Sequence, residues 1–368
     1  MKIKNNIEPI NINYNPTKIV GNITKIVNTS SKLISSSNIN TAEVETVDIE
    51  EISNERVSLP ENGGPYDPRN DKYGLFGGNQ GSLQYNLEYY IDNEKVRQII
   101  SKYYPDFDSE DIELLFSRMN SVGCGYIASI NTIFQQYLFN NEIDFYNRFG
   151  FPPYNLVKDQ TTGKVYKDFN YEFLFLDFFL YCAKEIEDYE TIEEVYGNQA
   201  DIISGDLAIS GDGTSIEGMN GILSPYNILT TLKRYLADKG IDTTVTSWVD
   251  TWVRLKVKYG ITEDVSRLDK VVLVIKESLK EGKQVMVVDE NFNLYYPEDI
   301  DGNGLFDDIA YSDVGAHALS VVDITDSNQL IVSSWGKEYI IDISDIVQAS
   351  VTTIEYNDFS SDYESFVK

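Results

Sequence analysis

The order of the periodic segments most constrains the fold of this chain of 368 residues, because helical patterns come first and strand patterns follow. Apolar residues recur with helical spacing in the segments Glu94–Tyr103, Ser109–Arg118, Tyr171–Ile186, Pro225–Ala237 and Leu268–Lys280. From about residue 284 to residue 356 the pattern is that of an antiparallel sheet. Helices followed by strands are typical of the α+β class. The sequence therefore predicts an α+β fold, with a helical half at about residues 85–240 and a sheet half at about residues 241–356.

Residues 1–65 are rich in Asn, Ser and Thr and have little apolar periodicity, which predicts a flexible leader. Turn-forming residues end the leader, and residues 66–368 are expected to form one domain. Within that turn, Gly63-Gly64 is a candidate for cleavage by the protein itself, although a plain flexible joint is the interpretation we favour. The N-terminus lacks the apolar core of a secretory signal. We therefore expect a cytoplasmic location by default, with export by a route that uses no such signal as the alternative.

The charge balance excludes some classes of partner. The chain has 59 acidic and 30 basic residues and a formal net charge of −29. Nucleic acids and anionic membrane surfaces would repel such a chain, so neither is an expected partner. No stretch of about twenty apolar residues occurs, so no membrane insertion is expected either. The sequence gives no signal for the oligomeric state.

Two short motifs carry the candidate chemistry. The chain has a single histidine, His317 in Gly315-Ala316-His317-Ala318, and two cysteines, Cys124 and Cys182. Cys124 lies in Gly123-Cys124-Gly125 just before an apolar helical pattern, where the dipole and free N–H groups of a helix start lower the pKa of a thiol. His317 opens a β-branched strand, and a second strand, Gln329–Ser334, returns toward it after a turn. Ser333 or Ser334 at its end is a candidate to hydrogen-bond the imidazole.

These motifs resemble those of papain-like cysteine peptidases. Cys-Gly at a helix start, Gly-x-His-Ala at a strand start and Ser-Ser-Trp-Gly after the next strand occur in the order that the superfamily has, across roughly residues 112–345. The nearest branch is the bacterial one that includes the double-glycine bacteriocin-processing peptidases. The resemblance implies a papain-like fold, a thiol hydrolase activity on peptide or isopeptide bonds, and a peptide or protein substrate as partner. It requires no cofactor.

The resemblance also implies roles for individual residues. Cys124 would be the nucleophile and His317 the general base. The orienting Asn or Asp of the superfamily lies sixteen residues after the histidine, a position that Ser333 occupies here without a charge. The oxyanion donor is usually a Gln six residues before the cysteine, and that position is Arg118. Asn120 is the nearest amide and our choice for this role, with Gln80 as a distant alternative.

Other interpretations remain beside this one. Cys182 lies in an aromatic helix and is expected to be a structural core residue. Cys124 would also be compatible with a degenerate papain-like fold kept for binding. The same catalytic groups perform acyl transfer or deamidation when the acceptor changes. A catalytically silent, calcium-stabilised binding protein is the alternative from a different class.

An acidic loop supplies the one metal hypothesis. Counted from Asp299 as position one, the loop resembles the start of an EF-hand calcium loop. Side chains with oxygen ligands stand at positions one, three, five and nine, which are Asp299, Asp301, Asn303 and Asp307. Gly304 is at position six, and Leu305 at position seven offers a backbone carbonyl. Position twelve is Ala310, so the usual bidentate acid is missing, and Asp308 or Asp313 would have to replace it. The sequence thus predicts either a structural Ca²⁺ site or a solvated acidic turn between two strands.

Overall fold

The computed structural model describes residues 7–9, 75–137, 142–159, 161–187, 225–298, 300, 306–325, 327–346 and 349–357. The expected leader, apart from residues 7–9, lies outside these residues, and so does Gly63-Gly64. The chain forms two compact units. One consists of Met1–Val57 with Tyr154–Asp168, and the other of Ser58–Pro153 with Phe169–Lys368.

The smaller unit contains a three-stranded sheet in the order β1-β2-β3. Its strands are β1 (Ile7–Pro9), β2 (Tyr154–Asp159) and β3 (Val165–Phe169), of which the last residue belongs to the larger unit. β1 pairs with β2 in antiparallel register, with Ile7 opposite Asp159. The turn after β2 is stabilised by the Asp159 carboxylate, which accepts hydrogen bonds from the backbone N–H groups of Thr161 and Thr162.

An antiparallel sheet of eight strands forms the centre of the larger unit, in the order β4-β11-β5-β8-β9-β10-β6-β7. The strands are β4 (Thr243–Ser247), β5 (Gln284–Asp289), β6 (Phe292–Tyr295), β7 (Ile309–Val314), β8 (His317–Ile324), β9 (Gln329–Ser334), β10 (Lys337–Asp342) and β11 (Ser350–Tyr356). A short 3₁₀ helix, η3 (Ile343–Ile346), connects the last two. The mixed helix-and-sheet composition with antiparallel pairing confirms the predicted α+β class.

The described helices of the larger unit are α2 (Ser82–Tyr85), α3 (Leu87–Tyr90), α4 (Glu94–Tyr103), α5 (Ser109–Val122), α6 (Cys124–Tyr137), α7 (Glu142–Phe149), α8 (Tyr171–Glu187), α11 (Pro225–Asp238), α12 (Trp248–Lys258) and α13 (Arg267–Lys280). Side chains fix several of their starts. Asn93 caps α4 and Asp108 caps α5, where Asp111 completes a capping box. Ser247 and Ser266 cap α12 and α13.

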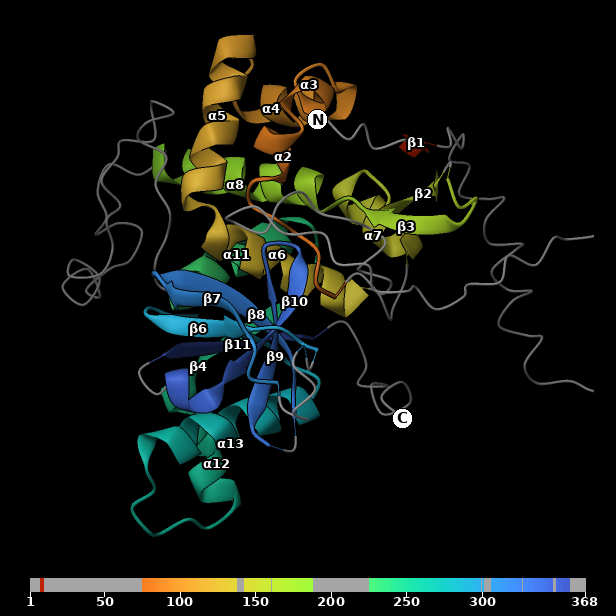
Figure 1. Ribbon diagram of the computed structural model, residues 1–368. Helices are drawn as coiled ribbons and strands as arrows, with labels where there is room; N and C mark the ends of the chain where they lie inside the picture. Colours follow the sequence, from red (N-terminus) through yellow and green to blue (C-terminus); the bar gives the residue numbers. More distant parts are fainter. Residues whose placement is uncertain are drawn as a thin grey trace, which may run out of the picture. The chain divides into compact units, whose positions relative to one another are not determined.

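Helices cover both faces of the large sheet (Figure 1). α6 and α11 pack on one face, and α13 packs on the other with α12 beside it. The alternation of side chains divides the strand residues between the two faces. Val285, Leu319 and Val332 belong to a core with Val271 and Ile275 of α13. Their sequence neighbours Met286, Ser320 and Ser333 contact α6 instead.

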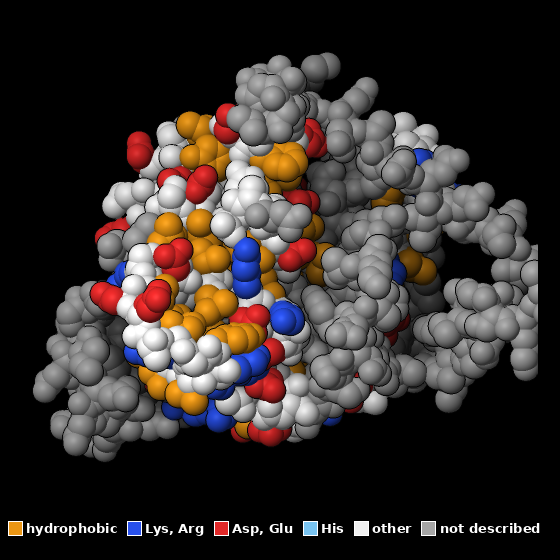
Figure 2. All heavy atoms as spheres, turned by 90° about the horizontal axis from the view of Figure 1, so that it is seen from below, with side chains coloured by type: hydrophobic (Ala, Val, Ile, Leu, Met, Phe, Trp, Pro, Cys, Tyr) orange, Lys and Arg blue, Asp and Glu red, His pale blue; other side chains and the backbone are white. Residues whose placement is uncertain are grey.

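The surface of the α12 side combines apolar and charged residues (Figure 2). On α12, Val249, Val253 and Val257 are exposed at intervals of four residues, with relative exposures of 49%, 56% and 79%. Patches of hydrophobic side chains on this side lie between Lys, Arg and acidic side chains. Among the helices that the structure describes, no apolar segment is long enough to cross a membrane.

Candidate functional site

The turn between α5 and α6 places Cys124 at the first residue of α6. A single residue, Gly123, separates the two helices, and its φ of −81° is open to any amino acid. The need for glycine is steric, since a Cβ here would collide with the carbonyl oxygen of Met119 and with the ring of Phe175. Close packing, rather than an unusual backbone angle, therefore requires the glycine before Cys124.

The thiol of Cys124 lies against the start of β8. Cys124 is partly buried, and burial raises the pKa of its thiol. Backbone hydrogen bonds from Ala318, Gly125 and Cys124 itself act in the opposite direction on this pKa. Ala318 follows His317 directly, so the thiol at the start of α6 contacts the backbone at the start of β8. Cys182 is buried in α8, as expected for a core residue.

His317 is the first residue of β8, and its ring is held on two sides. Its Nε2 atom lies 2.8 Å from Ser334 Oγ. The ring stacks on Trp335, with centroids 4.6 Å apart and an interplanar angle of 27°. His317 is only 7% exposed, and burial lowers the pKa of its imidazole to about 4. The imidazole is thus neutral near pH 7, with Nδ1 as the nitrogen that Ser334 does not contact.

Trp335 adopts an unusual backbone conformation to reach this ring. Its φ is +46°, followed by +75° at Gly336, in the tight turn that joins β9 to β10. Two successive positive φ values match the twist of a hairpin, although the first position usually holds Asn, Asp or Gly. The strain at a tryptophan indicates that its stacking position is held by the surroundings. Asn79 contributes to this, because its Nδ2 atom donates to the Trp335 carbonyl at 3.2 Å.

The structure places Ser334, rather than the expected Ser333, against the imidazole. Ser333 Oγ accepts a hydrogen bond from Asn131 Nδ2 of α6 at 3.0 Å, on the other face of the sheet. The reason is a register shift between Val321 and Asp323, where β8 has one more residue than β9. This extra residue lengthens the path from His317 around the turn by one, so the orienting position moves from 333 to 334.

The structure shows hydrogen-bond partners for both candidate oxyanion donors. Asn120 lies in α5, and its Nδ2 atom donates to Gln84 Oε1 at 2.7 Å. Gln80 is remote in sequence, but its Nε2 atom donates to the Asn120 carbonyl at 2.5 Å. A Cβ built on Gly123 would lie 3.2 Å from Gln80 Cβ. The distant alternative therefore lies beside the residue that precedes Cys124, and sequence spacing alone gave no signal of this.

The predicted calcium loop lies largely outside the described residues. Asp299, Asp301, Asn303 and Leu305 belong to the part that is not described, whereas Asp307 is described. Asp308, a candidate twelfth ligand, accepts a hydrogen bond from Ile300 N at 2.6 Å. Within the described ranges, no group of three or more His, Cys, Asp or Glu residues is arranged to hold a metal ion. The calcium site stays a prediction.

Comparisons with known proteins find no matching family model, no matching curated protein and no matching solved structure.

The burial of His317 gives a testable pH dependence. Because the pKa of about 4 in the folded protein lies below the ordinary value of 6.5, unfolded chains bind the proton more tightly than folded ones. This effect lowers the free energy of unfolding as the pH falls from 6.5 toward 4 and is absent above that range. Since the chain has one histidine, its imidazole ¹H NMR signals can be followed without overlap from another histidine. We expect a midpoint well below 6.5, and a midpoint above 7 would reveal an imidazolium paired with a thiolate.

Proposed function

We propose that this protein is a papain-like thiol hydrolase that cleaves peptide or isopeptide bonds through Cys124 and His317. The observation that carries the proposal is the meeting of two elements. The thiol at the start of α6 is hydrogen-bonded by the backbone of Ala318, the residue after His317, and the buried imidazole of His317 is held by Ser334 and Trp335. A nucleophile, a base and a group that orients the base are the parts that acyl transfer requires.

The proposed reaction begins from the neutral pair. Nε2–H of His317 donates to Ser334 Oγ, which leaves the lone pair of Nδ1 to accept the proton of Cys124. The sulfur attacks the carbonyl carbon and forms a tetrahedral intermediate. The imidazolium then gives its proton to the leaving amine, and a thioester remains on Cys124. Water attacks the thioester with His317 again as base, which releases the acid and restores the thiol.

Gln80 is our candidate for the side-chain oxyanion donor. One N–H of its amide is used by the Asn120 carbonyl, and the second is available for a substrate oxygen near Cys124. Backbone N–H groups at the start of α6 would supply the remaining donors. Asn120 has a supporting role in this proposal, because its carbonyl orients Gln80 while its own amide is bonded to Gln84.

The thiol chemistry can be tested without knowledge of the substrate. Iodoacetamide labelling and acylation by p-nitrophenyl acetate would be followed at Cys124 by peptide mass spectrometry, in wild type and in His317→Ala. We expect the replacement to slow both reactions roughly a hundred-fold, as loss of a general base does. Cys182 is 1% exposed and reports on folding, because it reacts only when the protein opens. Equal Cys124 rates in the two folded proteins would rule out the proposed hydrolase.

Separate replacement of Ser334 and Ser333 distinguishes a serine that orients the imidazole from one that only stabilises the fold. Ser334→Ala removes the hydrogen bond to His317 and should lower the turnover of p-nitrophenyl acetate on the order of ten-fold, with KM unchanged. Ser334→Thr keeps a hydroxyl and should restore most of it. Ser333→Ala leaves Asn131 without its partner and should destabilise the fold by about 1–3 kcal/mol while turnover stays near wild type. If Ser333→Ala lowered turnover more than Ser334→Ala, Ser333 would be the residue that orients His317.

A second pair of variants locates the oxyanion donor. Gln80→Ala should reduce acylation of Cys124 by p-nitrophenyl acetate about 10²-fold, because an oxyanion forms in that reaction. It should leave alkylation by iodoacetamide nearly unchanged, since that displacement forms no oxyanion. Asn120→Ala is the matched control, because it keeps the carbonyl that holds Gln80. If Asn120→Ala selectively impaired acylation and Gln80→Ala did not, Asn120 would be the donor.

A further inference from the structure

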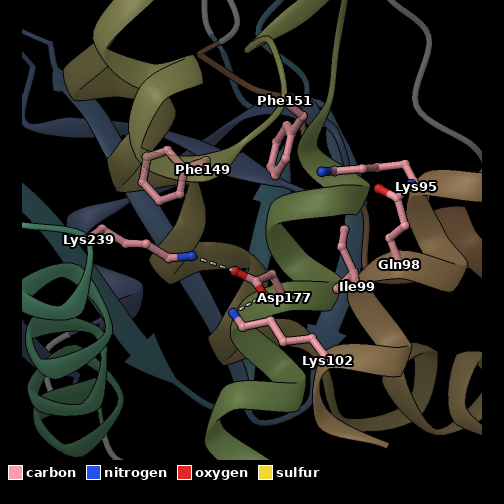
Figure 3. Close-up of a pocket in the computed structure, with 8 residues that line it drawn as sticks. All are labelled: Lys95, Gln98, Ile99, Lys102, Phe149, Phe151, Asp177 and Lys239. Carbon is pink, nitrogen blue, oxygen red and sulfur yellow. Dashed lines mark hydrogen bonds and ion pairs between the residues drawn. The ribbon is translucent and has the colours of Figure 1, made fainter. Parts of the chain in front are cut away.

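A cavity of about 230 Å³ lies within the helical part of the larger unit, lined by residues from four segments (Figure 3). Three of its lining residues are lysines. Lys95 and Lys102 come from α4, and Lys239 follows α11. Asp177 of α8 lies between the last two, and Phe149 and Phe151 form an aromatic wall. This gathering of cations stands out in a chain with a net charge of −29.

Asp177 is fully engaged with protein groups. Its Oδ1 atom accepts from Lys102 Nζ at 3.0 Å and from Tyr103 OH at 2.9 Å. Its Oδ2 atom accepts from Tyr235 OH at 2.7 Å and from Lys239 Nζ at 3.1 Å. Burial alone would raise the pKa of this carboxyl, but the two lysines and the tyrosine hydrogen bond outweigh it and the pKa is lowered. Asp177 is thus a fixed anion that orients two ammonium groups at the edge of the cavity.

Lys95 adds a cation that Asp177 does not bind directly. Its Nζ atom donates to the Gly150 carbonyl at 2.9 Å and lies 5.6 Å from the centre of the Phe151 ring. Burial lowers the pKa of Lys95, as do the nearby charges of Lys239 and Lys102, while Asp177 acts against them. Three ammonium groups therefore face one carboxylate, and the cavity has a surplus of two positive charges. The Lys239 side chain is 17% exposed and that of Lys102 is 50% exposed, so this partly buried surplus of positive charge favours the binding of an anion that compensates it.

We propose that the cavity binds a small oxyanion with two negative charges, held between Lys95, Lys102 and Lys239. Ammonium groups are point donors that approach such an ion from different sides, in contrast to the planar fork of arginine. Each lysine has three N–H donors, so the hydrogen bonds to Asp177 and Gly150 leave donors for a ligand. The volume is below that of pockets for drug-sized molecules and suits a phosphate group or a short dicarboxylate. The site is independent of Cys124 and of the proposed hydrolase activity.

The binding of inorganic phosphate and of succinate would be measured by calorimetry on the full chain, with sodium chloride at matched ionic strength as the blank. Lys95→Gln is the decisive variant, because it removes one charge and leaves the four hydrogen bonds of Asp177 in place. We expect it to weaken binding of the preferred anion about ten-fold or more, as the loss of a charge-assisted hydrogen bond does. Lys95→Arg keeps the charge and should retain most of the affinity.

Lys256→Gln is the matched control, since this exposed lysine of α12 lies outside the cavity and the variant has the same net charge as Lys95→Gln. It should bind as wild type does. Tighter binding of phosphate would identify a phosphate group as the natural ligand, and tighter binding of succinate a pair of carboxylates. The proposal is overturned if wild type binds neither at millimolar concentration, or if Lys95→Gln and Lys256→Gln lose affinity equally.

Discussion

The fixed position of α6 against the sheet is the constraint on which the candidate site depends. The helix is buried along most of its length, and three of its buried polar side chains are bonded to strand residues. Asn131 bonds to Ser333, Gln135 to Ser320, and Thr132 to Tyr356. A shift of the helix along the sheet would leave several of these groups buried without partners, at about 1–3 kcal/mol each. The register of α6 thereby fixes where Cys124 lies relative to the start of β8.

The segment before α2 provides a second constraint at the same place. It runs along α6, since the Leu75 carbonyl accepts from Gln135 and a Cβ on Gly78 would collide with Asn131 Oδ1. Gly78 has a φ of +89°, so both its backbone angle and this close approach require glycine. The segment continues to Asn79, bonded to the Trp335 carbonyl, and to Gln80, beside Gly123. It therefore links the helix start to the turn that covers His317.

Local signals in the sequence predicted several elements well, but the strands β2 and β3 lie within the expected helical half and were not predicted. The predicted bounds Glu94–Tyr103 and Gln329–Ser334 agree with α4 and β9, because a cap or a turn marks their ends. The site was predicted less completely, since its partners are set by tertiary structure. The bulge in β8 moved the orienting serine by one residue, and no local pattern announces such a bulge. Gln80 lies far in sequence from Cys124, and Lys239 lies far from Lys95 and Lys102 of α4, so only the fold brings these residues together.

Burial of the two proposed catalytic residues has a consequence for their resting charge states. It raises the pKa of the Cys124 thiol and lowers that of the His317 imidazole, so each charged form is disfavoured separately. A proton transfer between them creates both charges at once, and their attraction offsets part of that cost in a medium of low dielectric constant. A carboxylate beside the imidazole would favour the ion pair further, but Ser334 supplies no charge. In the proposed mechanism the charges therefore form only when a substrate carbonyl is present for the sulfur to attack. The oxyanion donors then stabilise the oxyanion of the tetrahedral intermediate.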